Sequence, residues 1–170
     1  MRSRASSIEI ATLTAQPAPP GIRVTTGLQY AALPWRDSGG KLEVLLITSR
    51  QSKRWILPKG WPIEGLSPQA SAAQEALEEG GITGRIAPAV LGSYHYFKRL
   101  KNGVSVPCKV VVFALEVTRL RRDWPEKADR TLRWCTPQEA ANAVTEAELK
   151  LLIRRFARQH NGSAQTAAGK

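Results

Sequence analysis

Residues 59–82 (KGWPIEGLSPQASAAQEALEEGGI) constrain the fold of this chain most, because they join a glycine-rich loop to a short helix with two specified ends. Ser67 is a typical N-cap residue, since its hydroxyl accepts a hydrogen bond from a free amide of the first turn. Pro68 follows at the first helical position, where its missing N–H costs nothing. Gly80 and Gly81 are typical of a helix end. The pattern therefore predicts a capped helix that follows a loop open to close backbone approach.

One face of this helix is acidic. Glu75, Glu78 and Glu79 are spaced i, i+3 and i+4, so their carboxylates are neighbours that repel by roughly 0.2–0.5 kcal/mol per pair. The other side of the helix is apolar and holds Ala73, Ala76 and Leu77. A divalent cation would turn the repulsion into attraction, because hard cations bind carboxylate and carbonyl oxygens. The helix pattern alone fits a solvated acidic face equally well, but the glycine-rich loop before it favours a metal site.

This spacing resembles the Nudix box, the loop–helix signature of hydrolases that cut nucleoside diphosphates linked to another group. The family pattern is Gly, five residues, Glu, seven residues, and then Arg-Glu-apolar-any-Glu-Glu-any-Gly-apolar. The positions that match in register are Gly60, Glu75, Ala76, Glu78, Glu79, Gly81 and Ile82. Two charged positions depart, because Leu66 stands where the Glu is expected and Gln74 where the Arg is expected. Our hypothesis is that a Glu–Arg pair bracing the loop against the helix is lost as a unit, while the helix carboxylates remain.

The residues before the box resemble one subgroup of the family, the diphosphoinositol polyphosphate phosphohydrolases. Residues 45–50 (LLITSR) and 54–60 (RWILPKG) are similar to the Ser-Ser-Arg and Arg-Trp-Ile-x-Pro segments of that subgroup, and Asp123-Trp124 is similar to its late Asp-Trp. The resemblance implies hydrolysis of phosphoanhydride bonds in diphosphoinositol polyphosphates or diadenosine polyphosphates. It also implies that Arg50 binds phosphate, because Arg50 matches a phosphate-contacting Arg of the subgroup.

The resemblance further implies a cradle for Mg²⁺, with Mn²⁺ as the alternative. Its expected ligands are the Gly60 carbonyl with Glu75, Glu78 and Glu79. Glu75 and Glu79 are the catalytic candidates, with Glu75 either a ligand or the base toward the attacking water. Glu116 on a later strand is a candidate further ligand, and its alternative is an ordinary surface Glu at a strand edge. The substrate-binding candidates are Arg50, Arg54, Lys59, Trp61, Lys98 and Arg99.

The charge of the chain indicates an anionic partner. The formal net charge is +11 and the isoelectric point is about 10.3, which favours a phosphorylated small molecule, nucleic acid or an acidic membrane. No apolar run approaches the ~20 residues needed to span a bilayer, so we expect no membrane partner. Cys108 and Cys135 lie apart and form no CxxC pair, which is typical of a reducing compartment such as the cytoplasm. Two alternatives stay open: an enzyme that trims the 5′ triphosphate of RNA, and a module that binds anionic ligands without turnover.

The chain is long enough for one domain. We expect a flexible arm at residues 1–20, the domain at 21–160 and a disordered tail at 161–170. Strands are expected at residues 22–35, 42–49, 85–97 (one or two strands around Pro88), 104–117 and 131–135. An Asn102-Gly103 hairpin turn is expected before the fourth of these regions.

Two capping boxes predict helices near the end of the chain, Thr136 with Glu139 and Thr145 with Glu148. The second helix has an apolar stripe that we expect in the core: Leu149, Leu152, Ile153 and Phe156. Strands on both sides of one internal helix, closed by a later helix, predict an α/β fold with a mixed sheet between helices. This agrees with the α/β/α sandwich that the resemblance to Nudix domains implies for residues 22–158.

Overall fold

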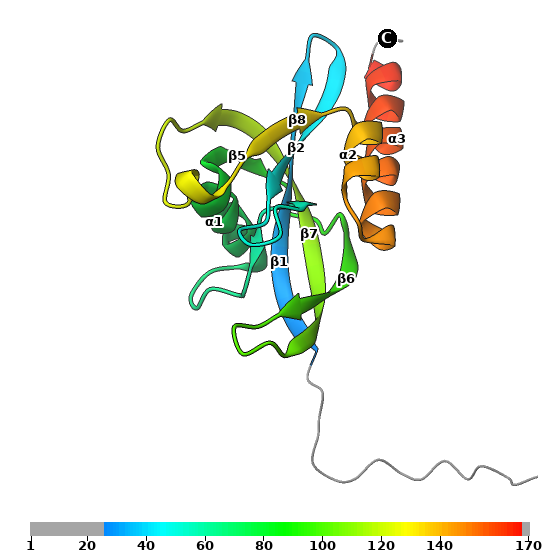
Figure 1. Ribbon diagram of the computed structural model, residues 1–170. Helices are drawn as coiled ribbons and strands as arrows, with labels where there is room; N and C mark the ends of the chain where they lie inside the picture. The colour runs from blue at the N-terminus through cyan, green and yellow to red at the C-terminus, as the bar shows by residue number, and fades with distance from the viewer. Residues whose placement is uncertain (1–25, 168–170) are drawn as a thin grey trace, which may run out of the picture.

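A computed structural model describes residues 26–167 of the chain, and the arm predicted for residues 1–20 lies outside them (Figure 1). The strands are β1 (Gly27–Ser38), β2 (Lys41–Thr48), β3 (Trp55–Ile56), β4 (Lys59–Gly60), β5 (Ile82–Ile86), β6 (Gly92–Arg99), β7 (Ser105–Leu120) and β8 (Leu132–Cys135). The helices are α1 (Pro68–Gly80), α2 (Pro137–Ala143) and α3 (Ala147–Ala167), with a short 3-10 helix η1 (Lys127–Asp129). The region predicted around Pro88 therefore forms two strands, since proline cannot donate to a sheet ladder.

The strands form one mixed sheet with β1 and β7 at its centre. The order is β3-β2-β1-β7-β5, while β4 pairs with β1, β6 with β7 and β8 with β2. β1 and β7 run parallel, from Gly27 opposite Cys108 to Trp35 opposite Glu116. The other pairings within the described residues are antiparallel. β7 spans 16 residues and pairs with β6 along its first half and with β5 along its second.

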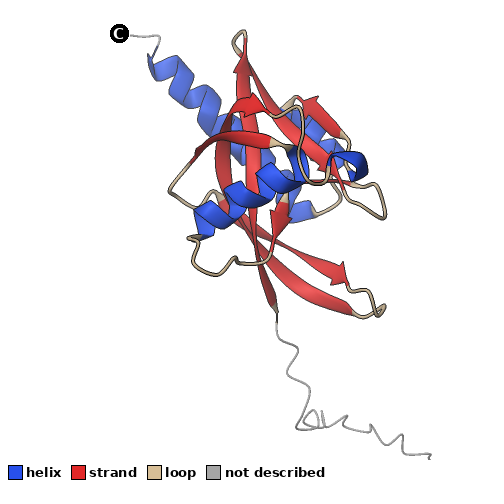
Figure 2. Cartoon of the chain, turned by 90° about the vertical axis from the view of Figure 1, so that its left-hand side faces the viewer, coloured by secondary structure: helices blue, strands red, loops and turns tan. Residues whose placement is uncertain are grey.

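Helices cover both faces of the sheet (Figures 1 and 2). On one face, Ala76 of α1 packs in a cluster with Ala32, Leu45, Ile82 and Leu115. On the other face, α2 and α3 cover a larger cluster that includes the predicted stripe of Leu149, Leu152, Ile153 and Phe156. The predicted α/β/α arrangement with a mixed sheet between helices is therefore confirmed. Within residues 26–167, no helix is both long enough and apolar enough to cross a membrane.

The two predicted capping boxes have different outcomes. The first is confirmed, because the Thr136 side chain and the Glu139 side chain each accept a backbone hydrogen bond from the other residue. The second is wrong: the Glu148 carboxylate instead accepts the His95 N–H at 2.6 Å. Thr145 Oγ1 accepts a hydrogen bond from Arg54 at 3.0 Å. Tertiary contacts with β6 and with the loop before β3 therefore displace the local cap.

The predicted disordered tail is also corrected at its start. α3 continues to Ala167, past Asn161 and Gly162, where the predicted tail begins and whose residue types are typical of a helix end. Extending an existing helix adds one hydrogen bond per ordered residue, and the residues after Gly162 include Ala and Gln, which are good helix formers. A local stop signal is therefore overridden by a long helix that is already anchored on the sheet.

Candidate active site

The loop and helix of residues 59–82 are bound to each other by the predicted cap. Ser67 Oγ accepts the Ala70 N–H at 3.1 Å, and Pro68 opens α1. The hydroxyl of Ser71 accepts the Ile63 N–H at 3.2 Å, which ties the loop to the first turn. Gly81 ends the helix with φ of 63°, a left-handed conformation that glycine adopts without strain. The predicted loop–helix unit is confirmed.

Gly60 determines where the Glu75 carboxylate lies. Its strand β4 pairs with β1, where Gly60 lies opposite Tyr30. A Cβ atom at residue 60 would overlap the Glu75 carboxylate. Only glycine therefore lets this carboxylate lie directly against the loop backbone. The structure thus brings together two residues that the sequence predicted as metal ligands.

Glu79 is the most buried acidic residue of the helix, with 8% of its surface exposed. One carboxylate oxygen accepts the Lys59 N–H at 3.1 Å, and the other lies 2.6 Å from an Arg130 guanidinium nitrogen. The same guanidinium donates two hydrogen bonds to Glu126, at 2.6 and 2.8 Å, and one to the Thr48 carbonyl at 2.9 Å. Arg130 therefore neutralises two carboxylates and fixes the charged loop, residues 121–131 between β7 and β8, against α1.

The two departures from the box, Leu66 and Gln74, border the same cavity. Gln74 donates a hydrogen bond of 2.6 Å to Glu78 along the helix. Leu66 and Gln74 both line an apolar cavity of about 440 Å³ between α1 and β5. The Gln74 amide thus holds Glu78 without adding charge, and the apolar Leu66 side chain lies at the exposed rim of the cavity.

Burial and mutual repulsion perturb the titration of the site. Burial raises the pKa of Glu75 to about 7, with further contributions from the carboxylates of Glu79, Glu78 and Glu126. Burial also raises the pKa of Glu79, although Arg130 and Lys59 oppose this effect. Ionising both Glu75 and Glu79 is therefore unfavourable, and a bound cation would relieve this repulsion.

The carboxylates fit a hard divalent cation in donor type and in charge, but they are not a finished metal site. Within the described residues, no three acidic, histidine or cysteine side chains lie close enough to hold a metal ion. Both oxygens of Glu79 have donors, and Glu78 accepts from Gln74. Glu75 accepts no hydrogen bond from the described part of the chain. A cation would therefore meet Glu75 first and require Glu78 or Glu79 to exchange a partner.

The face of the sheet opposite α1 collects most of the predicted substrate-binding residues. The Lys59 ammonium lies 4.9 Å from the centre of the Tyr96 ring, and burial lowers the pKa of this lysine to about 8. The Lys98 ammonium lies 5.1 Å from the centre of the Trp61 ring. Arg54 lies nearby, 3.6 Å from Glu146 at the start of α3. Lys59, Trp61, Lys98 and Arg54 therefore lie on the same side of the sheet.

Three predicted residues lie elsewhere. Arg50 is largely exposed and lies 3.7 Å from Glu126, on the side of the charged loop. Arg99 follows Lys98 along β6 and so projects from the opposite face of the strand. Glu116 is bound by Arg85 at 2.7 Å, and its neighbour Leu115 is the residue that faces α1. Glu116 therefore points away from the helix carboxylates, because successive strand residues alternate between faces.

Sequence reasoning missed three charged residues and two uncharged polar ones. For Arg130 and Glu126 the available signal was their i, i+4 spacing, which is typical of an ion pair. Gln29, Tyr96 and Glu146 were not singled out. A lone amide inside an apolar strand was the available signal for Gln29, which is fully buried.

Fold and site together define a class of domain, an α/β/α sandwich in which a glycine-rich loop and a capped acidic helix meet beside a mixed sheet. The NUDIX domain family model matches residues 28–156, and the chain belongs to that family. Nudix hydrolase 12, mitochondrial, of Arabidopsis thaliana is 31% identical over 129 residues, which cover 72% of this chain and 64% of the relative. Diphosphoinositol polyphosphate phosphohydrolase 3-alpha of Mus musculus is 32% identical over 105 residues, which cover 60% of each chain.

The chain thus matches less than two thirds of the length of each of these relatives. Among solved structures, the crystal structure of the C. elegans Ap4A hydrolase is similar with a TM-score of 0.59 and 22% identity, covering 79% of this chain and 98% of that one. At this identity the likeness shows a shared fold. The resemblance to Nudix domains and to the diphosphoinositol subgroup is confirmed.

Proposed function

We propose that the protein is a divalent-metal-dependent hydrolase that cleaves phosphoanhydride bonds of polyanionic substrates, namely diphosphoinositol polyphosphates or diadenosine polyphosphates. The observation that carries the proposal is the Glu75 carboxylate held against Gly60, with Glu78, Glu79 and Glu126 acting on its charge. Family membership and the relatives named as hydrolases support it. A location in the cytoplasm is part of the proposal, supported by two buried free cysteines, Cys108 and Cys135.

The proposed chemistry assigns one role to the cation and the rest to this chain. Mg²⁺, with Mn²⁺ as the alternative, would neutralise phosphate charge and lower the pKa of a bound water. The residues that would hold it are the Gly60 carbonyl with Glu75, Glu78 and Glu79. Glu75 is also the better candidate for accepting a proton from water, because its carboxylate has no hydrogen-bond donor among the described residues, whereas Glu79 has two.

Cationic side chains would bind the phosphates of the substrate. Lys59 belongs to the strand that also presents Gly60, so its ammonium and the carboxylate cluster lie on either side of one short backbone segment. Lys98 extends the positive charge along β6. Positive groups fixed near the phosphoryl oxygens stabilise the charge that develops there during hydrolysis.

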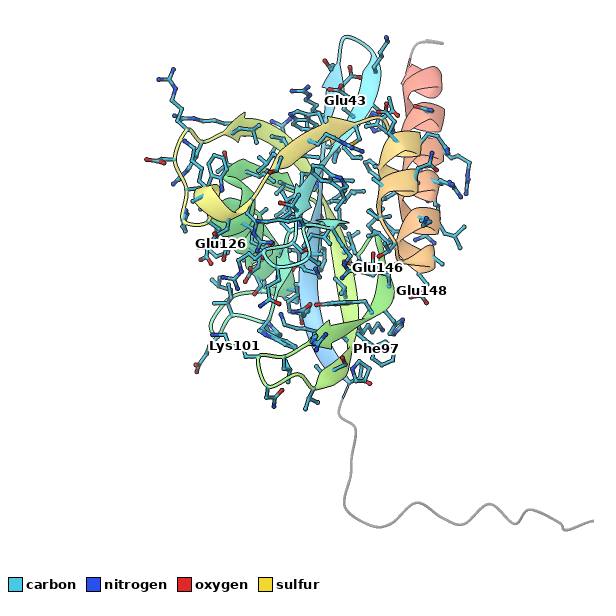
Figure 3. All side chains as sticks on the ribbon, viewed as in Figure 1. Glu43, Phe97, Lys101, Glu126, Glu146 and Glu148 are labelled. Atoms are coloured by element: carbon cyan, nitrogen blue, oxygen red, sulfur yellow. The ribbon has the colours of Figure 1, made fainter. Side chains whose placement is uncertain are left out.

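A second candidate is trimming of the 5′ triphosphate of RNA, and the β6–β7 hairpin favours it. Phe97 is 72% exposed on this hairpin, and Lys101 lies at its turn (Figure 3). Exposed aromatic rings beside cations suit single-stranded nucleic acid, since bases stack on the rings and phosphates bind the cations.

The test is product release from a panel with Mg²⁺ present: an inositol pyrophosphate, diadenosine hexaphosphate, ADP-ribose and triphosphorylated RNA. We expect turnover of the first two, and its loss in Glu75→Gln. Glu64→Gln is the matched control, because Glu64 is an exposed loop residue outside the carboxylate cluster. Turnover of RNA alone would favour the second candidate. No turnover of any substrate by folded wild-type protein would refute the hydrolase.

A further inference from the structure

Two buried polar atoms lack partners on the face of the sheet opposite α1. They are Gln29 Nε2 and Glu146 Oε2, and within the described residues no other buried side-chain nitrogen or oxygen is unpaired. One is a hydrogen-bond donor and the other, when ionised, an acceptor. Unpaired buried groups are costly in folded proteins, so a buried donor and a buried acceptor that both lack partners indicate a ligand.

Both residues border the same side chain, Tyr96. The Tyr96 hydroxyl donates a hydrogen bond of 2.6 Å to Gln29 Oε1, which orients the amide and leaves its NH₂ group free. Glu148 binds the His95 N–H at 2.6 Å, which places the start of α3, and so Glu146, beside this part of β6 (Figure 3). Arg54 approaches only the other oxygen of Glu146, at 3.6 Å. Consistent with this proximity, burial, Cys108 and Glu146 together raise the pKa of Tyr96.

A flat apolar surface lies next to the donor. The Trp61 ring packs over Gly27, because a Cβ atom there would lie 2.9 Å from the ring. Gly27 and Gln29 are two residues apart on β1 and so share a face of the sheet. Trp61 keeps 42% of its surface exposed, and Lys98 lies above its ring. An aromatic platform, a donor and an acceptor therefore lie on the same face of the sheet as Lys59, across β4 from the proposed site of hydrolysis.

We propose that Gln29 and Glu146 determine substrate specificity by reading a nucleobase with an exocyclic amine next to a ring-nitrogen acceptor, the edge that adenine presents. This inference rests on the proposed function and decides between its two substrate classes. Gln29 Nε2 donates to the ring nitrogen, Glu146 Oε2 accepts from the amine, and Trp61 stacks on the base. The Lys59 side chain, which lies over the Tyr96 ring, moves aside to admit the base edge, while Tyr96 keeps its hydrogen bond to Gln29.

An inositol pyrophosphate does not satisfy this pair. Its ring carries phosphate groups, which are anionic acceptors and offer no donor to Glu146 Oε2. Two anions facing each other in a partly buried site repel strongly, whereas a neutral base satisfies both unpaired atoms at once. The structure thus favours dinucleoside polyphosphates among the polyanionic substrates.

The experiment is calorimetric titration of the full chain with AMP and with IMP, without added metal. In IMP the ring nitrogen carries a proton and the exocyclic group is a carbonyl, so both hydrogen-bonding roles are reversed. We expect AMP to bind about tenfold more tightly than IMP or better, because a mismatched edge leaves buried groups unpaired. Glu146→Gln replaces the acceptor by an amide that can donate, so the AMP/IMP ratio should fall toward one. Gln29→Leu should lower the ratio as well.

Glu148→Gln is the matched control, since it makes the same substitution two residues away and should leave the ratio unchanged. A structural defect would weaken AMP and IMP binding equally, so the ratio separates recognition from folding. Equal affinities in the wild type, or an unchanged ratio in Glu146→Gln, would overturn the inference. Selective AMP binding without turnover of any panel member would support the subsite while refuting the hydrolase, so the two proposals fail separately.

Discussion

Replacing Arg130 with methionine removes a guanidinium whose side chain is only 4% exposed and which binds Glu79 at 2.6 Å. Glu79 is itself nearly buried, so its charge would lose its main counter-ion. Breaking a buried ion pair by removing one partner costs about 3–5 kcal/mol, because the remaining charge stays uncompensated. Methionine fills a similar volume, so little of this loss comes from a cavity. We therefore expect the free energy of unfolding to fall by about 3–5 kcal/mol.

Arg85→Met is the control for the Arg130 prediction, because Arg85 binds Glu116 at nearly the same distance, 2.7 Å, but with 71% and 38% of the two side chains exposed. Such an exposed pair contributes only about 0–1 kcal/mol. Urea unfolding at neutral pH measures both variants, and the slope with denaturant should stay constant. Adding Glu79→Gln to Arg130→Met should restore part of the loss, since it removes the unpaired charge. Equal costs for Arg130→Met and Arg85→Met would refute this reasoning.

Three further perturbations test other features. Gly60→Ala places a methyl group on the Glu75 carboxylate, so we expect turnover to fall at least tenfold while thermal unfolding stays cooperative. Leu66→Glu combined with Gln74→Arg should show a favourable coupling of about 0.5 kcal/mol in a double-mutant cycle of unfolding, if the family's pair was lost as a unit. Backbone and hydroxyl hydrogen bonds in the first turn of α2 lower the pKa of Glu139. The stability that the Thr136–Glu139 capping box contributes is therefore present above the ordinary carboxyl pKa and is lost as pH falls through the lower folded-state pKa. Glu139→Gln should reduce the fall in the free energy of unfolding at acid pH.

Controls and contrary outcomes for these tests are direct. Gly162→Ala is the control for Gly60→Ala, since a Cβ at residue 162 meets no atom within 4 Å. Full activity in Gly60→Ala would show that Glu75 does not act from its present position. Additive effects of the Leu66 and Gln74 substitutions would mean that the two departures arose independently. An unchanged fall in the free energy of unfolding at acid pH in Glu139→Gln would show that other carboxylates set the pH dependence.

The loop–helix unit and the fold class could be predicted from the sequence because their signals are local and repeated. Ser67, Pro68 and Gly81 specify helix α1 by short-range chemistry, and the stripe from Leu149 to Phe156 specifies the buried face of a different helix, α3. The second capping box failed for the opposite reason: Glu148 finds a better partner 53 residues away in His95. A local sequence pattern cannot show that a distant residue competes for the side chain of a predicted cap.

The same limit applies to the site. The helix carboxylates share a face by periodicity, so their grouping was accessible from spacing alone. The Arg130 bridge to Glu79 spans 51 residues, and the Tyr96 bond to Gln29 spans 67. The sequence did not show that Glu116 points away from the helix carboxylates. A strand position fixes only that a side chain alternates with its neighbours, and the face that Glu116 takes is set by how β7 pairs.

The parallel pairing of β1 with β7 has a consequence for how the protein is made. Gly27 must find Cys108, and Trp35 must find Glu116, so the central ladder closes only after nearly two thirds of the chain has been synthesised. The whole acidic helix lies inside the segment that this ladder encloses. A nascent chain on the ribosome therefore carries the three carboxylates of α1, Glu75, Glu78 and Glu79, long before it has the sheet on which they converge. Because such distant pairing folds slowly, the pairing of β7 with β1, rather than the appearance of the acidic residues, sets when the site first exists.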